Sequence, residues 1–524
     1  MTLIAVAAVQ AQHDSHGMPA LSRELLERPL PLRHGIGSAH DAVATTVPDA
    51  QAYYDQGLAY LHSYMWIEAA RSFHQALRLD SKLATAYVGL SYAYVELNAP
   101  VVARAALDHA RTLAPGAGAH DRRHIDLRVA QMGAEDAPHD PALLAAYRNA
   151  LDAALTAFPS DEELWLSRGL AESADPAERG QGSGTGAVRF FEQAIALAPA
   201  HFAGHHYLAH AFENTGRSAD ALKEGGIYAR MAPQVPHARH MLGHELRRTG
   251  RIDDAIAEFT AADRLEAEYI TREHVPEAHV WHYHHNLDLL ATSYQYVGRM
   301  RKAEELLKRA FAIPSNSVEQ ELNKREWPAF LIARGRETEA LAAASEMKSH
   351  SSPLVRAMGH IQAGFARLAM TQPSAAVTEA NAALTLMRAS PEAAGLVAPS
   401  LRQLQGEVFL ATGEREKGRM ALMKTAEEVR AAPGPDGWAR AIFTLESVAR
   451  AARSAGDWQV AGWAARQMLE HDPNYGGTHY ALALVARHNG DAPAERAEAA
   501  RARTLWAGAD ATLSELQDLK RSHP

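Results

Sequence analysis

The stretch 52–81, AYYDQGLAYLHSYMWIEAARSFHQALRLDS, recurs at 86–115 as AYVGLSYAYVELNAPVVARAALDHARTLAP. The offset is 34 residues throughout, and residues of similar size recur at matched positions, which pair Gly57 with Ser91, Ala69 with Ala103, Phe73 with Leu107 and Ala76 with Ala110. Small residues let two antiparallel helices approach closely, while large apolar residues fill the space between neighbouring pairs. The chain is therefore predicted to stack helix pairs rather than to form one globular core.

The same frame returns along the rest of the chain, at 165–199, 202–234, 236–269, 284–317, 321–350, 357–390, 399–432, 442–475 and 476–505, with a degenerate copy near 118–160. A Gly followed by Arg or Asp marks several predicted inter-helix turns, at Gly216, Gly250, Gly298 and Gly490. The pattern resembles the tetratricopeptide repeat (TPR). This resemblance implies an all-α, right-handed superhelical solenoid of about twelve helix pairs.

Breaks in the period predict the organisation of the chain. We expect a signal-peptide remnant at 1–12, an irregular strap at 13–49, N-terminal repeats at 50–201, central His-rich repeats at 202–317 with an insertion at 270–283, C-terminal repeats at 318–507 and a tail at 508–524. The first twelve residues form a short apolar run that ends in small residues, although a basic start is missing. This favours export to the periplasm or beyond; the alternative is the frayed start of a cytoplasmic protein. No run of 18 apolar residues predicts a transmembrane segment.

The composition and the missing motifs exclude several classes of ligand and reaction. The formal net charge is −9 and no block of five basic residues occurs, so nucleic acid is not an expected partner. With 0 Cys, a metal would need His, Asp, Glu or backbone oxygen as ligands. Motifs for nucleotide binding and for serine hydrolases are missing. Paired carboxylates such as Glu162-Glu163 are interpreted as complementing the dipole at a helix start.

Histidines gather in the central repeats, where twelve of the 28 lie between His201 and His285. Several recur three, four or seven residues apart, together with carboxylates, and so share one stripe of their helices. The predicted ligands of a mono- or dinuclear zinc, copper or iron site are His206, His210, Glu213, His237, His240, His244, His285 and Asp288. Neither H-x3-H pair encloses the Glu of a zinc protease, so that mechanism is not expected.

The TPR resemblance implies that these stripes face the concave groove. A segment running through HFAGHHYLAHAFE (201–213) and PHARHMLGHELRR (236–248) also resembles a group of bacterial, often exported TPR proteins with His-rich middle repeats, whose reaction the resemblance does not name. If the protein is an enzyme, an open metal position would activate water, oxygen or a substrate, with Arg247 or Arg325 orienting an anion.

Two other interpretations stay open. The groove histidines could contact a polypeptide or a small anionic ligand without any metal, in a non-enzymatic interaction scaffold. In that case the predicted ligand contacts are Arg247, Arg248, Arg325 and Tyr207, joined by Tyr54 and Tyr92. The histidines could also form a purely structural polar network.

Overall fold

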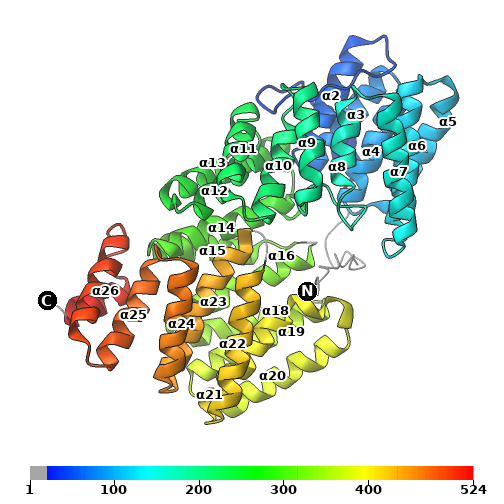
Figure 1. Cartoon of the computed structure of the whole chain (residues 1–524). Coiled ribbons are helices and arrows are strands. Elements are labelled where there is room, and N and C mark those ends of the chain that lie inside the picture. The colour runs from blue at the N-terminus through cyan, green and yellow to red at the C-terminus, as the bar shows by residue number, and fades with distance from the viewer. Residues whose placement is uncertain (1–20, 316, 433–434, 523–524) are drawn as a thin grey trace. The chain divides into compact units, whose positions relative to one another are not determined.

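The computed structural model describes residues 21–315, 317–432 and 435–522. Among these residues helices are joined by turns and irregular segments, and the only β-type pairing is one isolated parallel bridge between Ser38 and His201 (Figure 1). This confirms the all-α prediction. The chain divides after Val275 into two compact units, called unit 1 and unit 2 below, and each is described by itself. The predicted signal remnant, 1–12, and the first part of the strap lie outside the described residues.

Unit 1 is a succession of antiparallel helix pairs preceded by one short helix. In chain order its helices are α1 (Arg23–Glu27), α2 (Pro48–Leu61), α3 (Trp66–Leu79), α4 (Ala84–Glu96), α5 (Pro100–Leu113), α6 (Ala119–Glu135), α7 (Pro141–Ala157), α8 (Glu162–Leu170), α9 (Thr185–Leu197), α10 (Ala203–Asn214), α11 (Ser218–Met231), α12 (Pro236–Arg248) and α13 (Ile252–Glu273). A 3-10 turn, η1 (Ala114–Gly116), follows α5.

Unit 2 continues the pairing. Its helices are α14 (Trp281–Tyr296), α15 (Met300–Ala312), α16 (Val318–Asn323), α17 (Glu326–Ala333), α18 (Glu337–Lys348), α19 (Pro353–Ala369), α20 (Pro373–Arg388), α21 (Ala398–Ala411), α22 (Arg415–Ala431), α23 (Pro435–Ser454), α24 (Trp458–His471), α25 (Gly476–His488), α26 (Ala492–Leu505) and α27 (Ser514–Ser522), with 3-10 turns η2 (Glu277–His279) and η3 (Pro391–Leu396). The short α16 and α17 together take the place of one first helix. Helix α27 lies within the predicted C-terminal tail.

The predicted turn glycines end the first helix of their pairs. Gly216 has a φ of 75° and Gly250 one of 79°, a left-handed conformation that Gly adopts without steric cost. After each glycine the next residue donates its N–H back into the helix, as Arg217 does to Phe212 and Arg251 to Leu246, both at 2.8 Å. These bonds satisfy carbonyls that the helix end would leave open.

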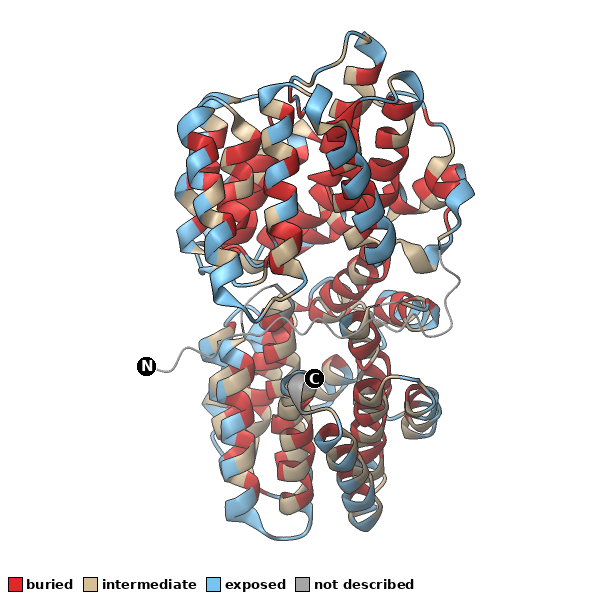
Figure 2. Ribbon diagram, turned by 90° about the vertical axis from the view of Figure 1, so that its right-hand side faces the viewer, coloured by how far each residue is buried: buried red, intermediate tan, exposed pale blue. Residues whose placement is uncertain are grey.

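Small and large residues interlock between paired helices, as the repeat pattern predicts. A Cβ at Gly57 would lie 2.5 Å from the Phe73 ring, and one at Gly243 would lie 2.6 Å from the Phe259 ring. Both aromatic side chains are fully buried. Figure 2 shows the result along the helices, which carry buried residues on one side and exposed residues on the other.

The strap between α1 and α2 runs along unit 1 in an irregular conformation. The carbonyl of Gly35 accepts the N–H of Gln234 at 2.8 Å, and that of Ser38 accepts the N–H of Phe202 at 3.4 Å. Residues before α2 thereby contact the segments that lead into α10 and α12. This brings the first repeat and the His-rich repeats into one unit.

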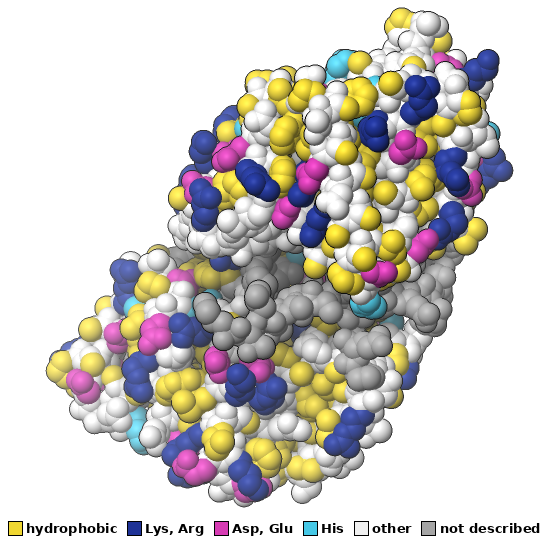
Figure 3. Space-filling model, turned by 45° about the vertical axis from the view of Figure 1, so that its right-hand side comes forward, with side chains coloured by type: hydrophobic (Ala, Val, Ile, Leu, Met, Phe, Trp, Pro, Cys, Tyr) yellow, Lys and Arg dark blue, Asp and Glu magenta, His cyan; other side chains and the backbone are white. Residues whose placement is uncertain are grey.

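The predicted insertion, 270–283, is partly helical. Helix α13 extends to Glu273 and ends at His274, whose φ of 50° is left-handed, and α14 begins at Trp281. No helix among the described residues is long and apolar enough to cross a membrane. On the face drawn in Figure 3, basic and acidic side chains are interspersed.

Candidate metal centre

The site begins with three histidines on two neighbouring first helices. His206 and His210 lie one turn apart on α10, so their side chains share one face of that helix. His237 lies in the first turn of α12, directly after Pro236, which is suited to a helix start because its missing N–H has no intrahelical partner there.

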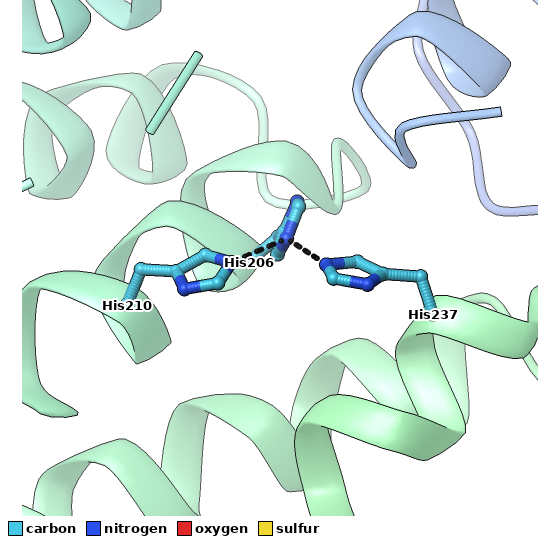
Figure 4. Close-up of side chains that lie close together, drawn as sticks. All are labelled: His206, His210 and His237. Carbon is cyan, nitrogen blue, oxygen red and sulfur yellow. Dashed lines mark hydrogen bonds between the residues drawn. The ribbon is translucent and has the colours of Figure 1, made fainter. Parts of the chain in front are cut away.

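The three imidazoles point toward one another (Figure 4). Nε2 of His206 lies 3.1 Å from Nε2 of His210 and 2.9 Å from Nε2 of His237. Two nitrogens bound to one zinc ion at the usual bond length are about 2.9–3.4 Å apart for bond angles of roughly 90–109°. Both distances match neighbouring ligands of one transition-metal ion, and one ligand atom of each of the three histidines lies within 4.8 Å of the others.

The backbone fixes which nitrogen of His206 faces its neighbours. Nδ1 of His206 lies 2.8 Å from the carbonyl oxygen of His62 and donates its hydrogen there, so the lone pair of the neutral ring is on Nε2. Burial lowers the pKa of His210 to about 4, which keeps that ring neutral near pH 7. The lone pair on Nε2 of His206 thus faces Nε2 of His210 and Nε2 of His237. A cation shared by the three nitrogens would stabilise this arrangement.

Two tyrosines enclose the cluster. The Tyr64 ring centroid lies 4.8 Å from those of both His206 and His237, and the Tyr228 ring stacks on His206 at 4.6 Å. Tyr64 follows the end of α2 with a left-handed φ of 59°, and its hydroxyl donates to the carbonyl of Arg179 at 2.8 Å. The three histidines are buried, so they lie in the interior of unit 1 rather than along an open groove.

A buried carboxylate fixes His62, the residue whose backbone carbonyl orients His206. Glu163, near the start of α8, accepts hydrogen bonds from Nε2 of His62 at 3.0 Å and from Nε2 of His201 at 2.9 Å. Burial alone would raise the pKa of Glu163, but the two histidines lower it well below its usual value. Sequence reasoning missed all three residues, because the interpretation of Glu162-Glu163 as a helix-start pair concealed the buried role of the second carboxylate.

A second group of predicted ligands lies further along the same two helices. The rings of His240 and His244 are 4.2 Å apart, and Nδ1 of His244 lies 3.6 Å from Oε1 of Glu213. Glu245, which was not predicted, is also buried; burial and the charge of Glu213 raise its pKa well above the usual value. These groups extend the polar interior of unit 1 beyond the three-histidine cluster.

His285 and Asp288 belong to α14 in unit 2, and their assignment as ligands stays a prediction. Within that unit, Asp288 is buried, and its Oδ2 lies 3.6 Å from Nδ1 of His284. His285 and Asp288 both line a small opening beside Arg440.

The predicted ligand-contacting residues are found in different surroundings. Tyr207 is fully buried and its hydroxyl lies 2.8 Å from Nδ1 of His62, so it supports the interior instead of facing a ligand. Arg247 is buried and Arg248 half-buried at the end of α12. Arg325 lies in unit 2, where it lines a cavity described below.

Fold and site together define an all-α protein of stacked helix pairs with a buried imidazole cluster. Residues 236–269, which form α12 and α13, match the family model of the tetratricopeptide repeat, so the chain contains a TPR. No curated protein sequence matches the chain.

Solved structures similar to the chain are helical proteins of comparable length. Yeast Tom70 has 13% identity and a TM-score of 0.32, over 90% of this chain and 94% of that one. The human IFIT1 dimer with PPP-AAAA has 12% identity and a TM-score of 0.39, over 82% and 91%. The apo form of the quorum sensor NprR from B. thuringiensis has 10% identity and a TM-score of 0.42, over 82% and 99%.

Proposed function

We propose that unit 1 binds one transition-metal ion through the Nε2 atoms of His206, His210 and His237. The observation that supports this most strongly is the convergence of these atoms at 2.9 and 3.1 Å, with the ring of His206 already oriented by a backbone carbonyl. Imidazole ligands suit zinc, copper and iron alike. The fixed orientation lowers the entropic cost of binding because little has to be ordered when the ion enters.

Three protein ligands leave a fourth position, which in this buried cluster a water molecule would take. We extend the proposal to that position: an ion there would polarise the bound oxygen, and Glu213, one turn beyond His210 on α10, is the nearby group to exchange a proton with it. The exported location predicted from residues 1–12 is part of the same proposal.

Elemental analysis of untagged, full-length protein tests the binding step. We expect about one equivalent of zinc, copper or iron to be lost in His237→Ala and in His210→Ala. The matched control is His205→Ala on the same helix, since His205 bonds to Glu224 at 2.6 Å, away from the cluster, and should keep the metal. Chelation should lower the melting temperature of the wild type and of the control, because an ion that binds only the folded state stabilises it.

A different outcome would show that the three histidines bind no metal. If His237→Ala and the wild type carry the same metal content, and if zinc, copper or iron added after chelation shifts the melting temperatures of both proteins equally, the cluster is a hydrogen-bonded network and the proposal is wrong.

A second candidate function, binding of an extended polypeptide or anionic ligand, has support in unit 2. A cavity of about 170 Å³ there has a mixed lining of arginines, glutamates and glutamines: Arg325, Arg440, Arg450, Glu326, Glu428, Glu446, Gln362 and Gln403. Gln362 is buried, and its Oε1 has no hydrogen-bond partner among the described residues. A buried amide oxygen at a cavity wall is a place where a ligand N–H gains a hydrogen bond at little cost.

An array of extended acidic peptides tests this second function. We expect binders whose signal falls with salt and is lost in Gln362→Ala and Arg325→Ala, whereas His237→Ala binds them unchanged. Peptides that bind both unit 2 variants as well as the wild type would exclude this cavity as the site.

A further inference from the structure

A second cluster of histidines and carboxylates lies elsewhere in unit 1, away from the three-histidine site. Asp41 comes from the strap, His120 and His124 lie one turn apart on α6, and Asp161 caps the start of α8. We propose that these four residues form a separate binding site for a divalent transition-metal cation with mixed nitrogen and oxygen ligands.

One ligand atom each from Asp41, His120 and His124 lies within 4.8 Å of the others, and Asp161 contacts both histidines. Nε2 of His120 lies 3.1 Å from Oδ1 of Asp41 and 3.0 Å from Oδ2 of Asp161, and Nε2 of His124 lies 3.0 Å from the same Oδ2. Neighbouring ligands at right angles around an ion, with bonds of about 2.1 Å, lie about 3.0 Å apart. The distances therefore match adjacent positions of a coordination sphere that leaves places for water.

The other oxygen of each carboxylate is held by the protein. Oδ1 of Asp161 accepts the N–H of Leu164 at 3.1 Å, and Oδ2 of Asp41 accepts the hydroxyl of Tyr54 at 3.2 Å. Each carboxylate is thereby oriented so that its remaining oxygen faces the histidines. Such supporting bonds are what orient metal ligands in characterised sites.

A third carboxylate orients the central imidazole. Nδ1 of His120 donates to Oδ1 of Asp121 at 3.2 Å, and Oδ2 of Asp121 accepts the N–H of Ala44 at 3.1 Å. Nε2 of His120 then faces two carboxylate oxygens, and a positive charge at this place, a proton or a metal ion, holds the three atoms together. Lone pairs that face one another repel unless a positive charge lies between them, and a carboxylate–histidine pair of this kind is typical of metal-bound imidazole.

Charge supports a cation over a single proton. Asp41, Asp121 and Asp161 are nearly buried, with side chains 4–7% exposed, and bring three negative charges to two imidazoles. Protons on Nε2 of His120 and of His124 can serve Asp41 and Asp161 one each, whereas a divalent ion attracts both oxygens and both nitrogens at once. His120 and His124 are 27% and 16% exposed, so an ion and its waters can reach them.

The ligand set indicates the class of ion and its effect. Imidazole with carboxylate suits Zn²⁺, Mn²⁺ and Fe²⁺, in contrast to the all-imidazole cluster on α10 and α12. Because Asp41 belongs to the strap while the other ligands belong to α6 and α8, a bound ion would fasten the strap to the repeats.

The test uses full-length His237→Ala protein, so that the three-histidine site does not contribute and the two proposals can fail independently. After chelation, Zn²⁺ or Mn²⁺ alone is titrated while binding and melting temperature are followed. We expect one ion to bind with a rise in melting temperature, and affinity to fall by about tenfold or more on adding His124→Ala or Asp161→Asn. Asn is itself a good helix cap, so Asp161→Asn removes the charge while keeping the start of α8.

The matched control is His40→Ala, which removes the histidine next to Asp41; its ring bonds to Asp55 at 2.7 Å instead. We expect this variant to bind the ion unchanged. If His237→Ala protein binds neither ion at 100 µM, a concentration about a hundredfold above a micromolar Kd, or if both added substitutions leave affinity unchanged, the cluster is an ion-pair network and the proposal is overturned.

Discussion

Nδ1 of His206 donates to the carbonyl oxygen of His62, 144 residues earlier in the chain, at 2.8 Å. This bond links the turn after α2 to the face of α10 that carries the candidate ligands. It decides the tautomer of His206 and so determines that Nε2 is the atom presented to His210 and His237. The orientation of the centre thus depends on residues that are distant in sequence.

Glu163→Gln is expected to weaken both the fold of unit 1 and its metal binding. Glu163 holds His62 and His201 through charge-assisted bonds in the interior, and a neutral amide replaces them poorly. We expect the free energy of unfolding to fall by about 3 kcal/mol and the metal affinity to fall about 10–100-fold. Denaturant titration and metal competition measure the two effects.

Glu162→Gln is the matched control, because the neighbouring carboxylate is only half-buried and holds neither His62 nor His201. It should change stability by less than about 0.5 kcal/mol. If the two variants lose equal stability, the negative charge at the start of α8 accounts for the loss, and the hydrogen bond from His62 to Glu163 does not.

The helix pairs and part of the candidate metal centre could be predicted from the sequence. Gly216 and Gly250 mark turns by their left-handed backbone, and the spacing of His206 and His210 alone puts both on one helical face. Periodicity cannot give the contacts of Glu163, since its partners lie 101 and 38 residues away and meet it only after the repeats stack. The H-x3-H spacing of His120 and His124 is visible in the sequence, but the carboxylates facing them come from the strap and from α8.

Two glycine substitutions should act in opposite directions. Gly243→Ala places a Cβ 2.6 Å from the ring of Phe259, so α12 and α13 must separate, and we expect a loss of about 1–3 kcal/mol. Gly133→Ala in α6 meets no atom within 4 Å and should stabilise by about 0.5–1 kcal/mol through helix propensity. Chemical denaturation compares them, and a Gly243→Ala protein as stable as wild type would contradict the close packing of this pair.

Arg71→Lys should loosen the strap. The guanidinium of Arg71 bonds at 2.7 and 2.8 Å to Glu68 and Glu273, and it also donates to the carbonyls of Arg28 and Pro29. An ammonium group cannot reproduce this fork of donors, so we expect a loss of about 2–4 kcal/mol and faster proteolysis near residues 28–45. Arg111→Lys serves as the control, since Arg111 is exposed and bonds to Asp108 on its own helix. Equal cleavage rates for the two variants would exclude the role given to Arg71.

Unit 2 should lose stability as the pH rises because of Glu407. Burial raises its pKa to about 7, while Gln403 donates to it at 2.9 Å. In the unfolded chain Glu407 loses its proton near pH 4.5. Between about pH 4.5 and 7 only the folded state keeps this proton. The free energy of unfolding therefore falls as the pH rises through this range. Glu407→Gln stays neutral at every pH and should be more stable than wild type at pH 8 by up to about 3 kcal/mol, with the difference vanishing near pH 4. Melting curves at the two pH values measure this, and a variant less stable than wild type at pH 8 would show that the ionised carboxylate, and not the neutral acid, is the form the folded unit prefers.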